Sequence, residues 1–391
     1  MASLFEIGKT GVQAYRQSLS VTGQNIANIN TEGYNKRSAD VNEIAGVSGG
    51  PTNVSDSTGL GVRVTNVRRS FDAYLTDKTR NSQSDFEMLK DFVSKLSDLE
   101  NMLLPSGSDL GVFIGRFFDS LQDVASNPDN VSARTVSLEA GQALVSAFNN
   151  YDEQLKNFKS SSIRQLDVKI TEANLYINQI AEVNKLIATS GSKDAANDVL
   201  DARDQLLKDL SKIFNFTVDY SSTGEAIVRL GDSGNGAYLV NRNKPSIISS
   251  SSDETNISIT VNNNGMKTKG IFSSGILSGI SQFYALTSSV RSEISDLAEQ
   301  LSTQINLIQT SGIDLNGNIG QTMFSVNSMA PKANFDNKSV LNFNLIEGDP
   351  SNIAQEKIIV NYSKPNNNWE IRDSNGLSYG YGNKINLEGF Q

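Results

Sequence analysis

The spacing of apolar residues predicts a chain built mainly of long helices. Residues 4 to 29 repeat with a period of seven, which places two rows of side chains along one face of a helix. This face, called the seam below, consists of Phe5, Gly8, Val12, Tyr15, Leu19, Thr22, Ile26 and Ile29. Gly8 and Gly11 each weaken the helix by roughly 1 kcal/mol, so the helix needs a packing partner. No mate is evident among its near neighbours, and we expect the seam to pack against other polypeptide.

Further helices are predicted at residues 70–104, 110–126, 132–189, 194–214 and 275–310. The longest of them keeps an unbroken heptad from Leu166 to Ile187, with Asn184 at one core position. At 1.5 Å per residue this helix would be about 85 Å long. We expect the helices between 70 and 310 to pack against one another within one domain.

Strands are predicted in three places. Alternating segments at 37–44 and 61–67 flank a loop rich in Gly and Ser and indicate a short β element. Short β-type runs (FTVDY, AIVRL, AYLV and ISITV) return between 216 and 272, and the chain is β-type again from about 324. The predicted fold class is mainly α with inserted β: an elongated, coiled-coil-like bundle of long helices plus a β-rich outer domain.

The length of 391 residues exceeds that of a single core, so we expect several domains. An N-terminal helix and connector occupy residues 1–36. A long-helix domain follows at 37–323, with the β element at 37–67 and a β-rich insert at about 216–274. Residues 324–391 begin a β-rich outer domain.

Composition excludes several classes of function. With 34 basic against 43 acidic residues the net charge is −9, which disfavours nucleic acid as a partner. The chain has no Cys and no His, which removes disulfides, thiolate nucleophiles and the commonest metal ligands. It holds no apolar run long enough for membrane insertion and no cleaved signal pattern. These absences eliminate most hydrolase and redox mechanisms and leave carboxylate and Ser–Lys chemistry open. We expect no catalytic centre, no metal and no cofactor.

Two short motifs are interpreted as turns. "SGSK" at 190–193 has the spacing of a Ser–Lys nucleophile pair, but the companion motifs of such enzymes are absent. "DLNGN" at 314–318 resembles the start of a calcium loop. An EF-hand needs Gly at its sixth and Glu at its twelfth position, where this chain has Ile319 and Ser325.

The stretch "TGQNIANINTEGYNKR" at 22–37 resembles the signature of the bacterial flagellar rod, hook and hook-associated proteins. In that family a heptad helix is followed by a turn of the pattern Ala-Asn-x-x-Thr-x-Gly-Tyr/Phe. Glu32 stands where the family often has Pro. The residues that match this connector motif are Ala27, Asn28, Thr31, Gly33 and Tyr34.

Later stretches are similar to the hook-associated protein 1 family, the hook–filament junction proteins. They are "NPDNVSARTVSLEAGQALVSAFN", "NDVLDARDQLLKDLSKIFNFTVDY" and "SGIDLNGNIGQTMF". The resemblance extends to about residue 325. Members of the family end in a helix that pairs with the N-terminal one, whereas this sequence ends in β-type residues at Gln391. We therefore expect the sequence to be a C-terminally truncated fragment.

The resemblance implies a structural protein rather than an enzyme. It implies self-association in a ring or helical array, located outside the cell in the bacterial flagellum. The implied partners are the hook protein, the second junction protein (hook-associated protein 3), the flagellar type III export apparatus and a dedicated export chaperone.

Three alternatives stay open. The chain could be another axial subunit, from the hook or distal rod. Its outer β region could carry a glycan-acting enzyme or an adhesin-like module. The carboxylates available for such an enzyme are Glu347, Asp349, Glu356, Glu370 and Asp373.

Overall fold

The computed structural model describes residues 4–44, 61–105, 109–190, 197–263, 265–270, 272–314 and 317–325, together with three strands between 359 and 382. The chain divides into two compact units, Met1–Phe324 and Ser325–Gln391. The described part of the second unit is an antiparallel sheet of three strands in chain order. They are β10 (Ile359–Ser363), β11 (Asn368–Arg372) and β12 (Ser378–Gly382). Among the carboxylates proposed for an enzyme, only Glu370 falls in a strand, and the other four lie outside the described residues.

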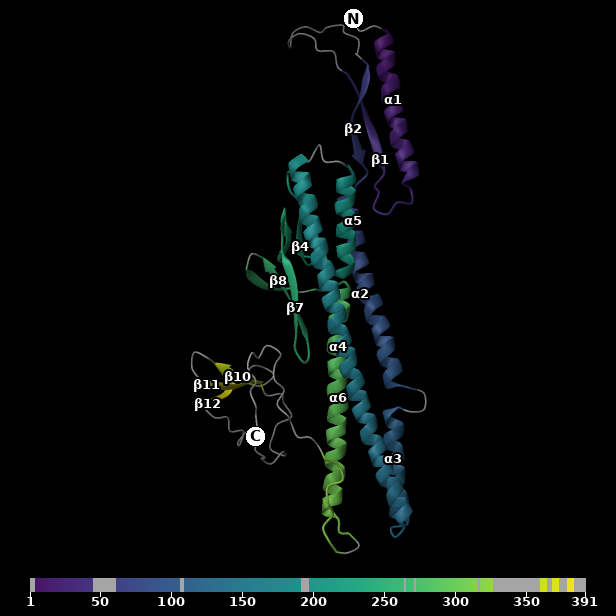
Figure 1. Ribbon diagram of the computed structural model, residues 1–391, viewed down its shortest axis with the longest axis vertical. Helices are drawn as coiled ribbons and strands as arrows, with labels where there is room; N and C mark the ends of the chain where they lie inside the picture. The colour runs from purple at the N-terminus through teal and green to yellow at the C-terminus, as the bar shows by residue number, and fades with distance from the viewer. Residues whose placement is uncertain are drawn as a thin grey trace. The chain divides into compact units, whose positions relative to one another are not determined.

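Six helices make up most of the described part of the first unit (Figure 1). They are α1 (Leu4–Ala27), α2 (Ala73–Leu103), α3 (Leu110–Ser126), α4 (Val131–Ser190), α5 (Asn197–Ile213) and α6 (Ile276–Ser311). Each was predicted, with ends within three residues of those observed. Side-chain caps explain several starts: Asp72 accepts from the backbone N–H of Leu75, and Asp109 accepts from that of Val112.

The heptad predicted on α4 forms the main apolar core. All seven of its core positions from Leu166 to Ile187 are buried. Five of them, Leu166, Ile170, Ala173, Ile177 and Ile180, pack with residues of α5, the neighbouring strands and the start of α6. A smaller core joins α2, α4 and α6 around Leu99, Leu155 and Phe283. The helices between 70 and 310 therefore pack on one another, as the sequence predicted.

The polar core position of this heptad connects α4 to the strands. Asn184 is fully buried, and its Nδ2 donates to the carbonyls of Ala226 and Arg242, both at 2.7 Å. Its Oδ1 accepts from the N–H of Ala226 at 2.9 Å. Arg242 has a φ of +59°, and its carbonyl is held by this bond. Asn184 thus provides hydrogen-bond partners for backbone groups at the ends of two neighbouring strands, and does not pair with a second helix.

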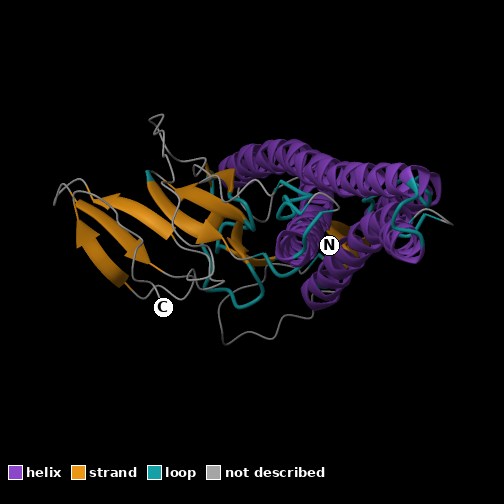
Figure 2. Cartoon of the chain, turned by 90° about the horizontal axis from the view of Figure 1, so that it is seen from below, coloured by secondary structure: helices purple, strands orange, loops and turns teal. Residues whose placement is uncertain are grey.

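Two antiparallel sheets lie to one side of the helices (Figures 1 and 2). The first contains β3 (Phe216–Tyr220), β4 (Ala226–Leu230), β5 (Tyr238–Asn241) and β6 (Lys244–Pro245). The second contains β7 (Ile247–Ser252), β8 (Ile257–Asn263) and β9 (Met266–Gly270). The sequence prediction missed β6, β7 and β9. β7 carries four serines and no clear alternation, and it is fixed instead by Asn174 of α4, which exchanges two hydrogen bonds with the backbone of Ile248.

Side chains from two helices hold the turn between β7 and β8. Lys159 of α4 donates to the carbonyl of Glu254 at 2.5 Å. Tyr284 of α6 donates to the carbonyl of Asp253 at 2.5 Å. Arg291 of α6 lies 3.4 Å from a carboxylate oxygen of Glu254. These contacts anchor the second sheet to the helix bundle.

Substituting Tyr284→Phe removes one of these hydrogen bonds without changing the shape of the core. We expect it to lower the free energy of unfolding by about 1 kcal/mol, because the buried Tyr284 side chain loses its hydrogen bond to the carbonyl of Asp253. Urea unfolding followed by circular dichroism measures this change. Tyr74→Phe is the matched control, because Tyr74 is 73% exposed. An equal effect from both substitutions would contradict the assigned role of Tyr284.

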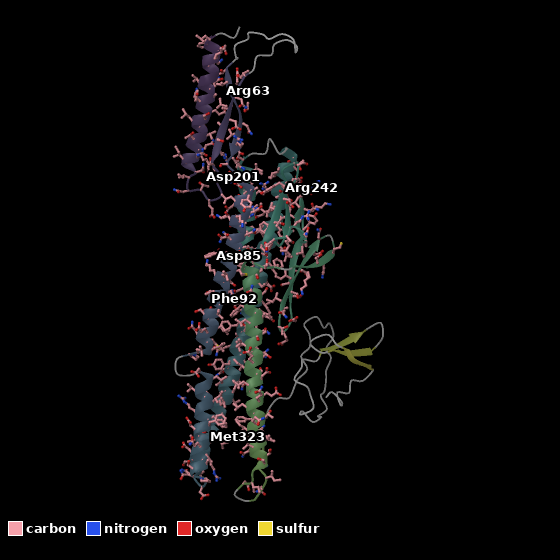
Figure 3. The ribbon with its side chains drawn as sticks, turned by 180° about the vertical axis from the view of Figure 1, so that it is seen from behind. Arg63, Asp85, Phe92, Asp201, Arg242 and Met323 are labelled. Carbon is pink, nitrogen blue, oxygen red and sulfur yellow. The ribbon has the colours of Figure 1, made fainter. Side chains whose placement is uncertain are left out.

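The end of α6 is closed by a segment that folds back onto the helices. Asn306 accepts from the backbone N–H groups of Met323 and Phe324 and donates to the carbonyl of Phe324. The ring of Phe324 then packs edge-on against Phe117 of α3, with centroids 5.7 Å apart. Figure 3 labels Met323 at this position.

Within the calcium-like motif, Asp314 accepts from the N–H of Asn318, as in a polar turn. Residues 191–193 of the Ser–Lys motif lie outside the described residues.

Candidate functional site

The N-terminal helix packs on a two-stranded ribbon formed by β1 (Arg37–Glu43) and β2 (Val62–Arg69) (Figure 1). Ala14 and Val21 of α1 are buried. The backbone of Gly61 approaches α1 so closely that a Cβ there would lie 2.1 Å from Oγ1 of Thr10. The helix therefore has a partner within its own chain, which the sequence analysis did not identify.

The seam lies on another face of α1 and is exposed along its whole length. Phe5, Val12, Tyr15, Leu19, Ile26 and Ile29 are between 61% and 79% exposed. Gly8 and Thr22 are exposed as well. These side chains form a continuous row of large apolar groups that face solvent. The ribbon leaves this row uncovered.

Asn25 organises the connector between α1 and β1. Its Oδ1 accepts from the hydroxyl of Tyr34 at 2.8 Å and from the N–H of Arg37 at 2.9 Å. Its Nδ2 donates to the carbonyl of Arg37 at 2.8 Å. The sequence analysis missed Asn25. The available signal was its position, because it continues the row of Ala14 and Val21 on the ribbon side of α1.

The five residues of the predicted connector motif form the turn that leads from α1 into the ribbon. Ala27 is the last residue of α1, and Asn28 donates to the carbonyl of Gln24. Thr31 donates to Oδ1 of Asn28 at 3.1 Å. Gly33 has a φ of +81°, in the left-handed region that favours glycine. The ring of Tyr34 lies under the guanidinium of Arg37 at 5.0 Å.

Gly33→Ala is expected to weaken the connector by about 1–2 kcal/mol, because a side chain strains the left-handed conformation. Backbone amides of β1 should then exchange with deuterium about tenfold faster in hydrogen-exchange mass spectrometry. Gly23→Ala is a control of opposite sign, since Gly23 lies within α1 and has nothing within 4 Å of a Cβ. Faster exchange in both variants would contradict this account.

A buried cluster of arginines and aspartates joins the connector and ribbon to α5. Oδ1 of Asp201 accepts from Asn35 and Arg69, each at 2.9 Å, and its Oδ2 accepts from Arg37 at 3.1 Å. Asp204 accepts from Arg69 at 2.8 Å and from Arg203 at 2.9 Å. These charged side chains are 4–15% exposed. Figure 3 labels Asp201. The segment "LDARDQLL", noted above only as a resemblance, supplies both carboxylates.

Neighbouring carboxylates favour the charged form of Arg69 in this cluster. Burial opposes the charge of Arg69, but Asp204 and Asp201 outweigh it, and the net result is a raised pKa for the Arg69 guanidinium. At the surface beside the cluster, Lys208 lies 3.0 Å from Glu32 of the connector. The hydrogen bond and the charge of Lys208 lower the pKa of that carboxyl. At neutral pH, opposite charges thus join α5 to the ribbon through Arg69 and to the connector through Glu32.

The region combines exposed apolar side chains with buried pairs of opposite charge. Over the described residues, no group of three or more His, Cys, Asp or Glu side chains is arranged to hold a metal ion. Over the same residues, none of the helices combines the length and the apolar character that crossing a membrane requires. Its main features are the exposed seam of α1 and the polar contacts that join the connector and the ribbon to α5.

Family models match two parts of the chain. The model described as "Flagellar hook-associated protein FlgK helical domain" matches residues 96–324. The model described as "Flagella basal body rod protein" matches residues 5–35, which contain the seam and the connector.

Several curated relatives are named "Flagellar hook-associated protein 1". The protein of Escherichia coli is 26% identical over 95% of this chain and 68% of its own length. That of Salmonella typhimurium is 27% identical over 86% of this chain and 62% of its own length. That of Bacillus subtilis is 23% identical over 82% of this chain and 69% of its own length. The chain thus spans about two thirds of the length of these relatives.

A solved structure shows a similar fold. It is described as the flagellar hook junction protein FlgK from Burkholderia pseudomallei, and its similarity has a TM-score of 0.63 at 23% identity. The match covers 78% of this chain and 56% of that one. The long helices with inserted antiparallel sheets are therefore shared. Because the helical-domain model covers more than half of the chain, the protein belongs to the flagellar hook-associated protein FlgK family.

Proposed function

We propose that the chain is a structural subunit of the bacterial flagellum that forms the junction between hook and filament by helical self-assembly. The observation that carries this proposal is the exposed seam of α1, next to a helical unit that matches the FlgK helical domain. Membership of this family places the protein in the flagellum, outside the cell.

The proposed mechanism is burial of the seam between subunits. Fully burying a side chain such as Leu19 or Ile26 contributes roughly 1.5–3 kcal/mol. The small residues of the seam, Gly8 and Thr22, allow another helix to approach closely between the large ones. Contacts that join different surfaces of successive subunits do not close on themselves and generate an open helical array. The seam and the ribbon lie on different faces of α1, so both can be covered at once.

The proposed partners follow from the family. They are further copies of this chain, the hook protein and the second junction protein, hook-associated protein 3. We propose export without a cleaved signal through the flagellar type III apparatus, with a dedicated chaperone. We propose no enzymatic role, since the described site offers apolar side chains and paired charges rather than a reactive group.

Immunogold electron microscopy of isolated flagella tests the assignment. Antibodies are raised against the helical unit and applied to flagella from the source organism and from a strain that lacks the gene. We expect one band of gold at the boundary between hook and filament. Gold distributed along the hook or the rod would instead support the alternative of another axial subunit, and unlabelled flagella would reject both.

A further inference from the structure

The N-terminal arm, defined as α1, the connector and the β1–β2 ribbon, is attached to the rest of its unit mainly by polar contacts. Within the described ranges, no residue of the arm belongs to either apolar core. The arm meets α5 through the arginine–aspartate cluster, through Glu32 with Lys208, and through Asn197, which donates to the carbonyl of Val67 at 2.8 Å. Hydrogen bonds are directional, whereas apolar burial is not, so a few polar groups determine how the arm is oriented.

Three side chains of the arm donate hydrogen bonds to one carboxylate, that of Asp201. Asn35 comes from the connector, Arg37 from the first residue of β1 and Arg69 from the last residue of β2. All three donate to Asp201, over distances of 2.9–3.1 Å. Asn35 and Arg37 lie two residues apart, and Arg69 is paired with Arg37 across the ribbon, so all three donors lie at one end of the ribbon. Three directional bonds to one carboxylate restrict rotation more than one bond does. A single contact, such as the one between Glu32 and Lys208, restricts much less.

Asp201 is itself held in place by its surroundings. It lies on α5, whose apolar face, including Leu207 and Leu210, is part of the main core. Its neighbour Asp204 binds Arg69 from the other side and also binds Arg203. The Arg203 guanidinium lies 4.6 Å from the ring of Tyr220, on β3. The carboxylate that receives the arm is thus fixed to the rigid part of the unit.

We propose that Asp201 is a positioning residue that sets the orientation of α1 relative to the helix bundle, so that the seam is presented to a neighbouring subunit. The part that concerns the neighbour rests on the proposed function. The part that concerns orientation does not, because it is a property of the isolated chain.

A distance measurement on the full chain tests the orientation. The sequence has no Cys, so two introduced cysteines can be spin-labelled without background. Gln17→Cys on α1 and Gln179→Cys on α4 are suitable, because both positions are exposed. Double electron–electron resonance is expected to give a narrow distance distribution for the parent. Asp201→Asn should broaden it about twofold, because the amide keeps one acceptor oxygen and turns an NH2 donor toward one of the two arginines.

The matched control is Asp40→Asn. Asp40 also pairs with an arginine, Arg68, at 3.0 Å, but this pair lies wholly within the ribbon. The control should keep the narrow distribution. Asp201→Glu keeps the carboxylate and should give an intermediate width. An unchanged distribution in Asp201→Asn would overturn the proposal.

If Asp201→Asn fails to fold, Arg37→Gln provides the second variant. It removes one donor of the arm, and Arg37 is more exposed than Arg69. A narrow distribution in Arg37→Gln would then overturn the proposal.

Junction assembly in cells tests the link between orientation and function. Asp201→Asn should reduce assembly although the seam is intact. Normal assembly of Asp201→Asn with a broadened distribution would refute the link between orientation and assembly. If seam variants also assembled normally, the proposed function itself would be wrong.

Discussion

Replacing Val12 and Leu19 together with aspartate is expected to abolish assembly of the junction while leaving the isolated chain folded. Both side chains lie on the seam and are 61% and 70% exposed, so the monomer loses little when they change. In the assembled array the same positions would be buried. Each substitution then removes roughly 1.5–3 kcal/mol of apolar burial and adds an unpaired charge that costs several more. Repeated at every subunit contact, this change exceeds what the array can tolerate.

Complementation measures the effect. A strain that lacks the gene receives either the double variant or a control, and electron microscopy scores filaments attached to hooks. The matched control is Gln13→Asp with Ser20→Asp, which adds the same charges to exposed positions one residue further along α1. We expect the control to assemble and the seam variant to leave hooks without filaments. Circular dichroism should show the same helix content for both, and equal assembly by both would show that the seam is not an interface.

Asn184→Leu is expected to lower the free energy of unfolding by about 3–5 kcal/mol, although the heptad pattern alone would favour Leu at this position. Asn184 is fully buried and makes three hydrogen bonds to the backbone of Ala226 and Arg242. Leu would remove the hydrogen-bond partner of the N–H and carbonyl groups of the buried Ala226, and of the carbonyl of Arg242. Buried polar groups without partners cost about 1–3 kcal/mol each, which exceeds the gain from added apolar surface.

Urea unfolding followed by circular dichroism at helix wavelengths measures this loss. Asn178→Leu is the matched control, because Asn178 lies on the same helix, is exposed, and donates only to the carbonyl of Asn174 one turn earlier. We expect the control to change the free energy of unfolding by at most about 0.5 kcal/mol. A stabilised Asn184→Leu variant would mean that this position belongs to a helix–helix contact after all.

The helices could be predicted from the sequence because their signals are local. A period of 3–4 residues, the prolines at 105 and 128, and capping residues such as Asp72 and Asp109 lie within or next to each element. Strands β7 and β9 lack such signals, since β7 is rich in serine and β9 in lysine. β9 is held by pairing with β8, and β7 also by a residue that is distant in the chain. Asn174, for example, lies 74 residues from its partner in β7.

The same distinction applies to the site. The seam could be identified because its period lies within one helix, and the connector because its residues follow each other closely. The arginine–aspartate cluster could not be found in this way, since Asn35 and Asp201 lie 166 residues apart. Their contact depends on how the arm folds against α5. The "LDARDQLL" segment was noticed only as a resemblance, and its physical role appeared when its carboxylates were located in the fold.

The contacts that close the end of α6 have a consequence for the boundary between the two units. Asn306 and Phe117 hold Phe324 where the chain leaves the first unit. The backbone is therefore secured before the second unit begins. The residues that close α6 thus all belong to the first unit.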